Sequence, residues 1–284
     1  MSKGLLIAGP ARCGKTRLAS FLAEHCNDSS VLTVDTLLSF FALSNQKLDR
    51  KESANFAHEY LGRPRLMDTE KNITLTPLQE MGCSEESILE SLEFDIRETE
   101  MSIIGKILTQ WASLEQHEFW AAPELHAELF FHKILKSIPN LKFVILLRNP
   151  FESLAAAVFW RDYPCRTQNS KRVFYHSLFL WCLSAETGRI LNQKNPDKAV
   201  VVHLDKISWL IEREFLRDLK KSNHLKMDYE SLYFCYSSGK GHLCPDGSYR
   251  ELLTPDELMI ARELTKKWFN HYRQIIPHSS LLLK

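Results

Sequence analysis

The stretch from Gly9 to Thr16 reads Gly-Pro-Ala-Arg-Cys-Gly-Lys-Thr and constrains the fold of this 284-residue chain more than any other segment. It fits the pattern G-x-x-x-x-G-K-[ST], in which glycines let successive backbone N–H groups turn inward on phosphate oxygens. The apolar run Gly4–Ala8 before it predicts a buried parallel strand, and Lys15–His25 after it predicts a helix with one apolar face. A strand, a glycine-rich turn and the positive end of a helix together predict a phosphate-binding loop.

Each side chain of this loop has an expected role. Lys15 would reach the terminal phosphate-like group, and Thr16 would bond a phosphate oxygen or hold Mg²⁺. Asp35 ends the predicted strand Val31–Val34, where it would either orient an acceptor hydroxyl or a magnesium water, or cap a helix beginning at Thr36. The residues expected to bind the phosphate groups are Gly9, Ala11, Arg12, Cys13, Gly14, Lys15 and Thr16.

Composition restricts the classes of partner. Apolar residues make up 44% of the chain and charged residues 25%, as in a water-soluble globular protein with a large core. The formal net charge of +1 gives no overall field toward nucleic acid or a membrane surface, so we expect neither partner. Seven cysteines without CxxC or CxxH spacing predict reduced thiols and no metal site of zinc type. No signal peptide or apolar run of about 20 residues is visible, which predicts a cytoplasmic protein without a membrane span.

Predicted strands alternate with predicted helices over most of the chain. This alternation predicts an α/β fold with a central parallel sheet and right-handed crossovers. With the loop at its start, we expect a single P-loop domain over residues 1–284, of three layers α/β/α, with a mostly helical insertion at about 36–117. The later strands are expected at Phe119-Trp120, Lys142–Leu147 and Ala199–His203.

Capping signals locate the helices. Ser84–Gln116 predicts one long helix or two, and Pro123 suits the first turn of a helix running to about Ser137. Asn149 is the expected N-cap of a helix with Pro at its first position. The run Thr254-Pro-Asp-Glu257 is a capping box that would open a final helix to about Tyr272.

A second candidate anion site lies where the strand Lys142–Leu147 ends at Arg148. In open α/β sheets, ligands bind beyond the carboxyl ends of the strands. Arg148 would therefore pair bidentately with a phosphate, or else form a salt bridge with a nearby carboxylate.

At these residues the chain resembles the sulfotransferases that use 3′-phosphoadenosine 5′-phosphosulfate. In that family a loop like Gly9–Thr16 holds the 5′-phosphosulfate, and a strand followed by Arg-Asn-Pro, here at Arg148, holds the 3′-phosphate. A late Lys-Gly loop is similar to Lys240-Gly241, which the resemblance makes a further 3′-phosphate contact. The resemblance implies 3′-phosphoadenosine 5′-phosphosulfate as the donor co-substrate.

The chain departs from the family pattern at four places. Lys15 stands where the family usually has threonine, which is typical of an ATP-binding loop, and Glu152 stands for an aspartate. Ala156 replaces a serine that contacts phosphate, and Ala121–Pro123 replaces a segment with a lysine that stabilises the transferring sulfuryl group. The resemblance makes Lys15 the candidate replacement for that lysine.

The reaction needs a base that takes the proton of the acceptor hydroxyl. We favour His126, placed on the helix expected after the altered segment. Glu124 and Glu118 are neighbouring alternatives. His58 and Glu59 in the insertion are further alternatives, with no spacing to support them.

Three functions follow from these residues. The first is a sulfotransferase that transfers a sulfuryl group to a hydroxyl or amine acceptor, small or macromolecular, without a required metal. The second is a small-molecule kinase using ATP and Mg²⁺. The third is a catalytically weakened nucleotide-binding protein, motivated by the missing lysine and serine. The sequence leaves the acceptor and the oligomeric state open.

Overall fold

The computed structural model describes residues 3–26, 28–62, 65–68, 73–75, 77–162, 168–203 and 252–275, and the statements below concern these residues. The expected phosphate contacts Lys240 and Gly241 lie outside them, as does the helix expected after the strand at 199–203. None of the described helices is long and apolar enough to cross a bilayer.

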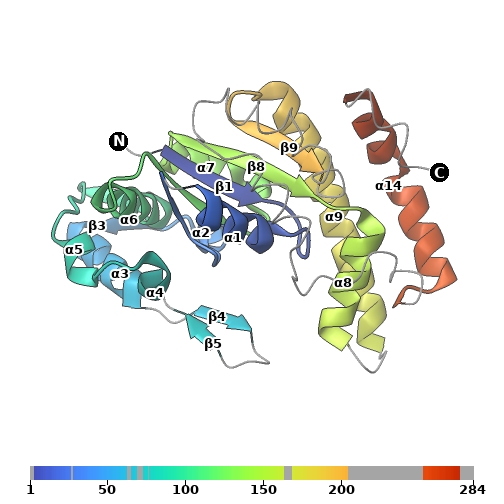
Figure 1. The fold of residues 1–284 in the computed structure, drawn as a ribbon, viewed down its shortest axis with the longest axis horizontal. Helices are drawn as coiled ribbons and strands as arrows, with labels where there is room; N and C mark the ends of the chain where they lie inside the picture. Colours follow the sequence, from blue (N-terminus) through green and yellow to red (C-terminus); the bar gives the residue numbers. More distant parts are fainter. Residues whose placement is uncertain are drawn as a thin grey trace.

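Five parallel strands form the central sheet, in the order β2-β7-β1-β8-β9 (Figure 1). The chain therefore places its first strand in the middle, with Ile7 opposite Pro123 on one side and Ala8 opposite Ile145 on the other. The expected α/β fold with a parallel sheet is confirmed. The strands are β1 (Lys3–Ala8), β2 (Ser29–Val31), β7 (Phe119–Pro123), β8 (Leu141–Leu147) and β9 (Ala199–His203).

Helices cover both faces of the sheet, which confirms the three-layer α/β/α arrangement. Alternate residues of a strand point to opposite faces, so a strand buried on both sides needs an unbroken apolar run. In β1, Leu5 and Ile7 pack in one cluster with α1 (Lys15–His25), whereas Leu6 and Ala8 pack in another with α6 (Glu100–Leu114) and α7 (Phe131–Ser137).

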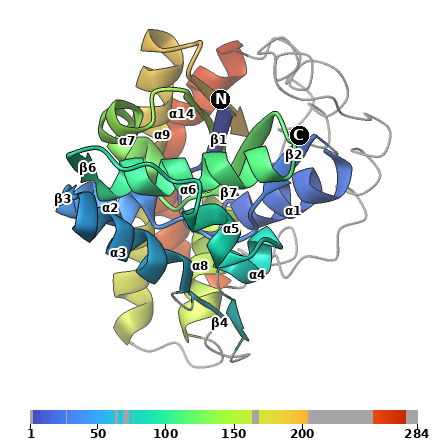
Figure 2. The same cartoon turned by 90° about the vertical axis from the view of Figure 1, so that its left-hand side faces the viewer.

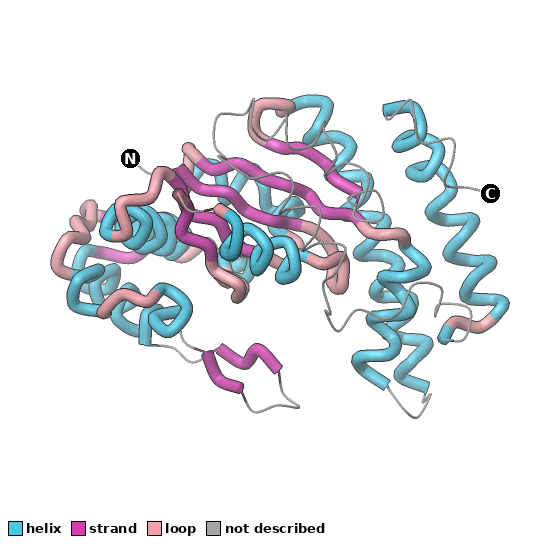
Figure 3. Tube along the Cα trace, viewed as in Figure 1, coloured by secondary structure: helices cyan, strands magenta, loops and turns pink. Residues whose placement is uncertain are grey.

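The insertion at about 36–117 is less purely helical than expected. Its helices are α2 (Leu38–Ser44), α3 (Arg50–Gly62), α4 (Pro77–Met81), α5 (Glu85–Leu89) and α6. Two antiparallel strand pairs lie among them, β3 (Lys47–Asp49) with β6 (Arg97–Thr99) and β4 (Arg65–Asp68) with β5 (Ile73–Leu75) (Figures 2 and 3). The stretch expected as one helix or two is broken by β6, because Thr99 caps a new helix by accepting a bond from Ser102 N.

Pro123 does not open a helix, and that prediction is wrong. Pro123 is the last residue of β7, where it pairs with Ile7 of β1, and the next residue continues the pairing because Glu124 N donates to Ile7 O at 2.9 Å. Proline suits a strand end as well as a helix start, and the apolar run before it decides for the strand. The helical region begins later, as a 3-10 turn η1 (Ala127–Phe130) followed by α7.

Three helices gather beyond the carboxyl end of β8, namely α8 (Pro150–Asp162), α9 (Gln168–Lys194) and α14 (Pro255–Ile275) (Figure 1). The expected capping box is present, since Thr254 N donates to Glu257 Oε2 at 2.7 Å and Glu257 N donates to Thr254 Oγ1 at 3.3 Å. Trp181 of α9 meets Trp268 of α14 edge-to-face with centroids 6.0 Å apart, which joins the two helices.

Candidate active site

The candidate site lies at the carboxyl ends of β1, β7 and β8, where the chain continues as the Gly9–Thr16 loop, as the 124–128 segment and as Arg148. The strand order makes β7 and β8 the two neighbours of β1, although more than 100 residues separate β1 from either of them in the sequence. A backbone bond joins two of the segments directly, because His126 N donates to Gly9 O at 3.1 Å. Such a strand-end edge is where open α/β sheets bind ligands.

The loop has the backbone conformation for which its glycines were expected. Gly9 has φ +133°, and a Cβ on it would lie 2.3 Å from the carbonyl oxygen of Leu146. Gly14 has φ +93° and is the N-cap of α1, so the helix begins directly at Lys15. Glycine is required at the first position and favoured at the second, since L side chains rarely adopt such φ values.

Lys15 fills the centre of the loop. Its Nζ donates to Gly9 O at 3.0 Å and to Pro10 O at 2.8 Å, and lies 3.8 Å from Cys13 Sγ. The side chain is buried, whereas Ala11, Arg12 and Thr16 are exposed. Burial raises the pKa of the Cys13 thiol, so this cysteine packs the loop as a neutral group. A buried cation beside an exposed rim of loop residues suits an incoming anion.

Glu124 ties the end of β7 to the insertion. Its carboxylate accepts bonds from the hydroxyl of Thr36 and from Ser39 N, the latter at 3.1 Å. Burial and, second, the nearby charge of Asp35 raise the pKa of Glu124 to about 7, although the hydrogen bonds from Thr36 and Ser39 act to lower it. The helix beyond Asp35 begins at Leu38 rather than Thr36, so Asp35 is not its N-cap and only its other expected role stays a prediction.

His126 lies beside the loop but not on a helix, which corrects the expected placement. It adopts φ +58° directly before η1. Its ring Nδ1 is 3.5 Å from Ser184 Oγ and 3.8 Å from Glu128 Oε1, and 14% of its side chain is exposed. Sequence reasoning missed Glu128 and Ser184. No sequence signal marks them, because they meet only when α9 packs on η1.

Arg148 takes the second of its two expected arrangements. It is buried at the end of β8, and its Nη2 lies 3.7 Å from Glu152 Oε2 in an ion pair. Trp181 Nε1 donates to Arg148 O at 3.0 Å, which fixes the backbone at this strand end. The expected cap is confirmed, since Phe151 N donates to Asn149 Oδ1 at 3.0 Å. The binding of a phosphate by Arg148 stays a prediction.

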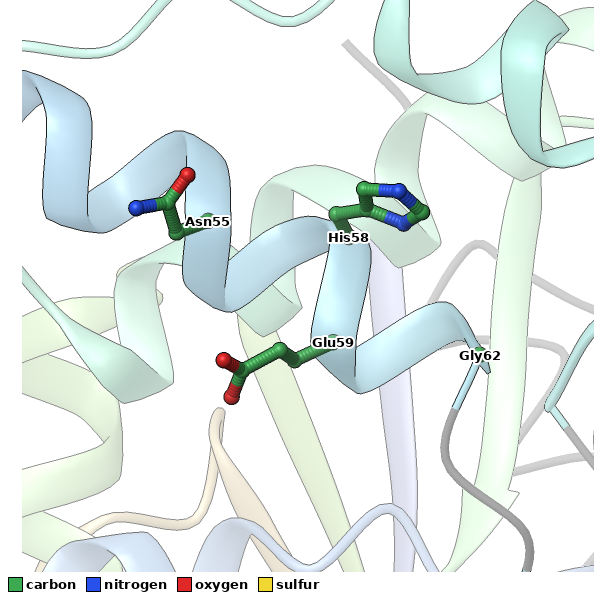
Figure 4. Close-up of a pocket in the computed structure, with 4 residues that line it drawn as sticks. All are labelled: Asn55, His58, Glu59 and Gly62. Atoms are coloured by element: carbon green, nitrogen blue, oxygen red, sulfur yellow. The ribbon is translucent and has the colours of Figure 1, made fainter.

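The remaining candidate bases lie elsewhere. Glu118 precedes β7, so the length of that strand, about 15 Å, separates it from the edge that carries the loop. His58 and Glu59 lie on α3, where they line a hollow of about 470 Å³ with Asn55 and Gly62 (Figure 4). The His58 ring contacts the carboxylate of Glu85, within the insertion. None of the described residues that line this hollow belongs to the loop.

These features define a P-loop protein of three layers, with its loop after the central strand of a parallel sheet. No protein-family model matches the sequence, and no curated protein matches it either. The fold is that of sulfotransferases, because several solved sulfotransferase structures superpose on nearly the whole chain.

Three of these structures give the extent of the likeness. The sulfotransferase domain of the Synechococcus PCC 7002 olefin synthase has a TM-score of 0.54 and 15% identity, over 93% of this chain and 95% of that one. The sulfotransferase domain from the curacin biosynthetic pathway has 0.53 and 14%, over 94% and 97%. Sulfotransferase STF9 from Mycobacterium avium has 0.52 and 11%, over 95% and 76%. At identities this low, the superposition shows a shared fold alone.

Proposed function

We propose that this protein transfers a sulfuryl group from 3′-phosphoadenosine 5′-phosphosulfate to a hydroxyl or amine acceptor. One observation carries the proposal: in a sulfotransferase fold, the backbone bond from His126 N to Gly9 O places a residue with a partly exposed imidazole next to the glycine-rich loop. A transferase of this kind needs a cationic cradle for the donor and a base within reach of the acceptor.

The proposed reaction assigns a task to each group. The acceptor oxygen or nitrogen forms a bond to sulfur while the bond from sulfur to the bridging phosphate oxygen breaks, which releases adenosine 3′,5′-bisphosphate. Lys15, Arg12 and the loop amides stabilise negative charge on the transferring and leaving oxygens. Lys15 would exchange its bonds to the carbonyls of Gly9 and Pro10 for bonds to the ligand.

His126 is the proposed proton acceptor rather than Glu124. Glu124 is only 2% exposed, and both oxygens of its side chain already accept hydrogen bonds from the start of the insertion. We assign Glu124 to holding α2 against β7. His126 has an exposed fraction that an acceptor can contact.

Arg148 is the proposed contact for the 3′-phosphate, with Lys240 and Gly241 by resemblance. Its guanidinium is buried beside Glu152, so the phosphate would have to compete with this carboxylate for it. A doubly charged phosphate is a stronger bidentate partner than an ion pair at 3.7 Å. The cytoplasm is the proposed location, on the four described cysteines that are free thiols, Cys13, Cys26, Cys83 and Cys182.

A kinase is the second candidate, because Asp35 interacts electrostatically with Glu124, whose N–H is bonded to Ile7 O at the end of β1 just before the loop. With Lys15 on the β- and γ-phosphates of ATP and Thr16 on Mg²⁺, Asp35 would orient a magnesium water or the acceptor. This assignment uses the same loop, so only the ligand distinguishes the two functions.

A thermal-shift titration separates them. We expect adenosine 3′,5′-bisphosphate in EDTA to raise the melting temperature by about 5 °C or more at 100 times its Kd. Arg148→Ala should abolish this shift, and the exposed Arg172→Ala on α9 should keep it as the matched control. Stabilisation by ATP with Mg²⁺ alone, unaffected by Arg148→Ala, would instead establish the kinase. Binding without turnover of labelled donor would favour a nucleotide sensor.

A further inference from the structure

We infer that Glu128 and Ser184 are positioning residues that hold the His126 ring in one orientation and one tautomer beside the phosphate loop. The catalytic purpose of this arrangement rests on the proposed function, whereas the orientation and the tautomer of the ring do not. The geometry joins two segments that are distant in sequence: His126 and Glu128 at the start of η1, and Ser184 on α9, 56 positions after Glu128.

Glu128 is a buried carboxylate with few partners. Its side chain has no exposed surface, and its Oε1 accepts a hydrogen bond from the hydroxyl of Ser184, which is itself fully buried. Its Oε2 has no hydrogen-bond partner among the described residues. A carboxylate left in this state costs free energy unless a cation or a donor compensates it. His126 is the ring that approaches it, at 3.8 Å.

Proton counting fixes the tautomer. A carboxylate only accepts hydrogen bonds, so the single hydroxyl proton of Ser184 goes to Glu128. Ser184 Oγ can then only accept from the His126 ring, whose Nδ1 lies 3.5 Å away. Nδ1 therefore carries a proton, which in the neutral ring leaves the lone pair on Nε2. A neutral imidazole with its lone pair on one defined nitrogen is the form that a general base requires.

The backbone holds the same residue from the other side. His126 has φ +58°, a left-handed conformation that residues other than glycine rarely adopt, and its N–H is bonded to Gly9 O. Ser184 lies one helical turn after Trp181, whose indole is bonded to Arg148 O. The loop, η1 and α9 thus fix both the backbone and the ring of His126. Packing alone would not need a buried carboxylate at this place.

Imidazole ¹⁵N shifts test the tautomer without any ligand. With ¹⁵N-histidine labelling at about pH 9, where an ordinary imidazole is neutral, His126→Asn assigns the His126 signals. We expect an Nδ1–H tautomer in the unmodified chain, and a shift toward Nε2–H in Glu128→Gln and in Ser184→Ala. An Nε2–H tautomer in the unmodified chain, or no change in either variant, would overturn the inference. This arm stands even if the chain turns over no sulfate donor.

Kinetics test the purpose. Glu128→Gln should lower kcat about 10- to 100-fold, as part of the 10²–10⁴-fold of general-base catalysis, with an unchanged KM for the donor. In a His126→Asn background the same change should have no further effect, because Glu128 acts through the ring. Glu100→Gln is the matched control, since Glu100 is also buried and bonded to a serine hydroxyl, Ser44, but within the insertion. Equal losses in Glu128→Gln and Glu100→Gln, or additive losses in the double variant, would refute the role.

Discussion

The carboxyl group of Glu124 predicts a measurable dependence of stability on pH. Its pKa rises from an ordinary 4.5 to about 7, first because the group is buried and second because Asp35 is charged nearby. Below pH 4.5 the group is protonated in both the folded and the unfolded chain, and its full contribution to stability is present. As pH rises toward 7, the unfolded chain ionises the group while the folded chain must keep it protonated. The free energy of unfolding therefore falls over this interval and levels off above it.

The size of this fall follows from the two pKa values. At 1.36 kcal/mol for each pKa unit, the change from 4.5 to about 7 corresponds to about 3 kcal/mol. Glu124→Gln removes the titration and keeps one of the two acceptor oxygens, which can accept from Ser39 N while the amide NH₂ faces the Thr36 hydroxyl. The unmodified chain should therefore lose about 3 kcal/mol relative to Glu124→Gln between pH 4 and pH 8.

Urea unfolding of both chains at several pH values measures this difference and cancels the other carboxyl groups. Asp35→Asn supplies a second check, because removing its charge should lower the pKa of Glu124 and reduce the fall in stability. A difference in unfolding free energy that stays constant from pH 4 to pH 8 would refute the assignment of a raised pKa to Glu124.

Three further predictions concern single side chains. Gly9→Ala should cost at least about 2 kcal/mol in urea unfolding because of its positive φ and close backbone neighbour, whereas Gly62→Ala, with open space around the added methyl group, should stay within about 0.5 kcal/mol. Hydrogen bonds from Arg189 lower the pKa of Glu186 to about 2, so Glu186→Gln should cost about 1 kcal/mol at pH 7, and this cost should disappear as pH falls from the ordinary 4.5 through about 2. Trp181→Phe removes a bond to the backbone at the end of β8 and should cost about 1–3 kcal/mol in thermal unfolding, and an unchanged melting temperature would contradict this.

Features with local signals could be predicted from the sequence. The bounds of α1 follow from Gly14 and the apolar face behind it, and the helix has those bounds. The caps at Asn149 and Thr254 form the bonds expected of them, because a cap depends on residues only two or three positions away. Apolar runs likewise located β1, β7, β8 and β9. The strand predicted at Val31–Val34 is wrong in its bounds, because β2 spans Ser29–Val31 and ends where the predicted strand begins.

Features that depend on contacts between residues distant in the sequence could not be predicted from it. Pro123 carries the signal of a helix start, yet pairing with β1 decides for a strand. The strand pairs in the insertion are only three or four residues long, too short for an alternating pattern to show. Glu128 and Ser184 are 56 positions apart and meet only through the packing of α9. The segments that make up the candidate site could be named from the sequence, but the partners of its histidine could not.

Helix α9 limits how the chain can change in length. Trp181 and Ser184 lie on one face of a continuous 27-residue helix, and each is bonded to a different strand-end segment. One inserted residue between them would turn the later side chain by about 100° around the helix axis. Only one of the two bonds could then form. Insertions and deletions should therefore be tolerated at the ends of α9 and excluded between Trp181 and Gly188. At Gly188 the helix lies close to β9, since a Cβ added there would be 3.1 Å from a methyl group of Val201.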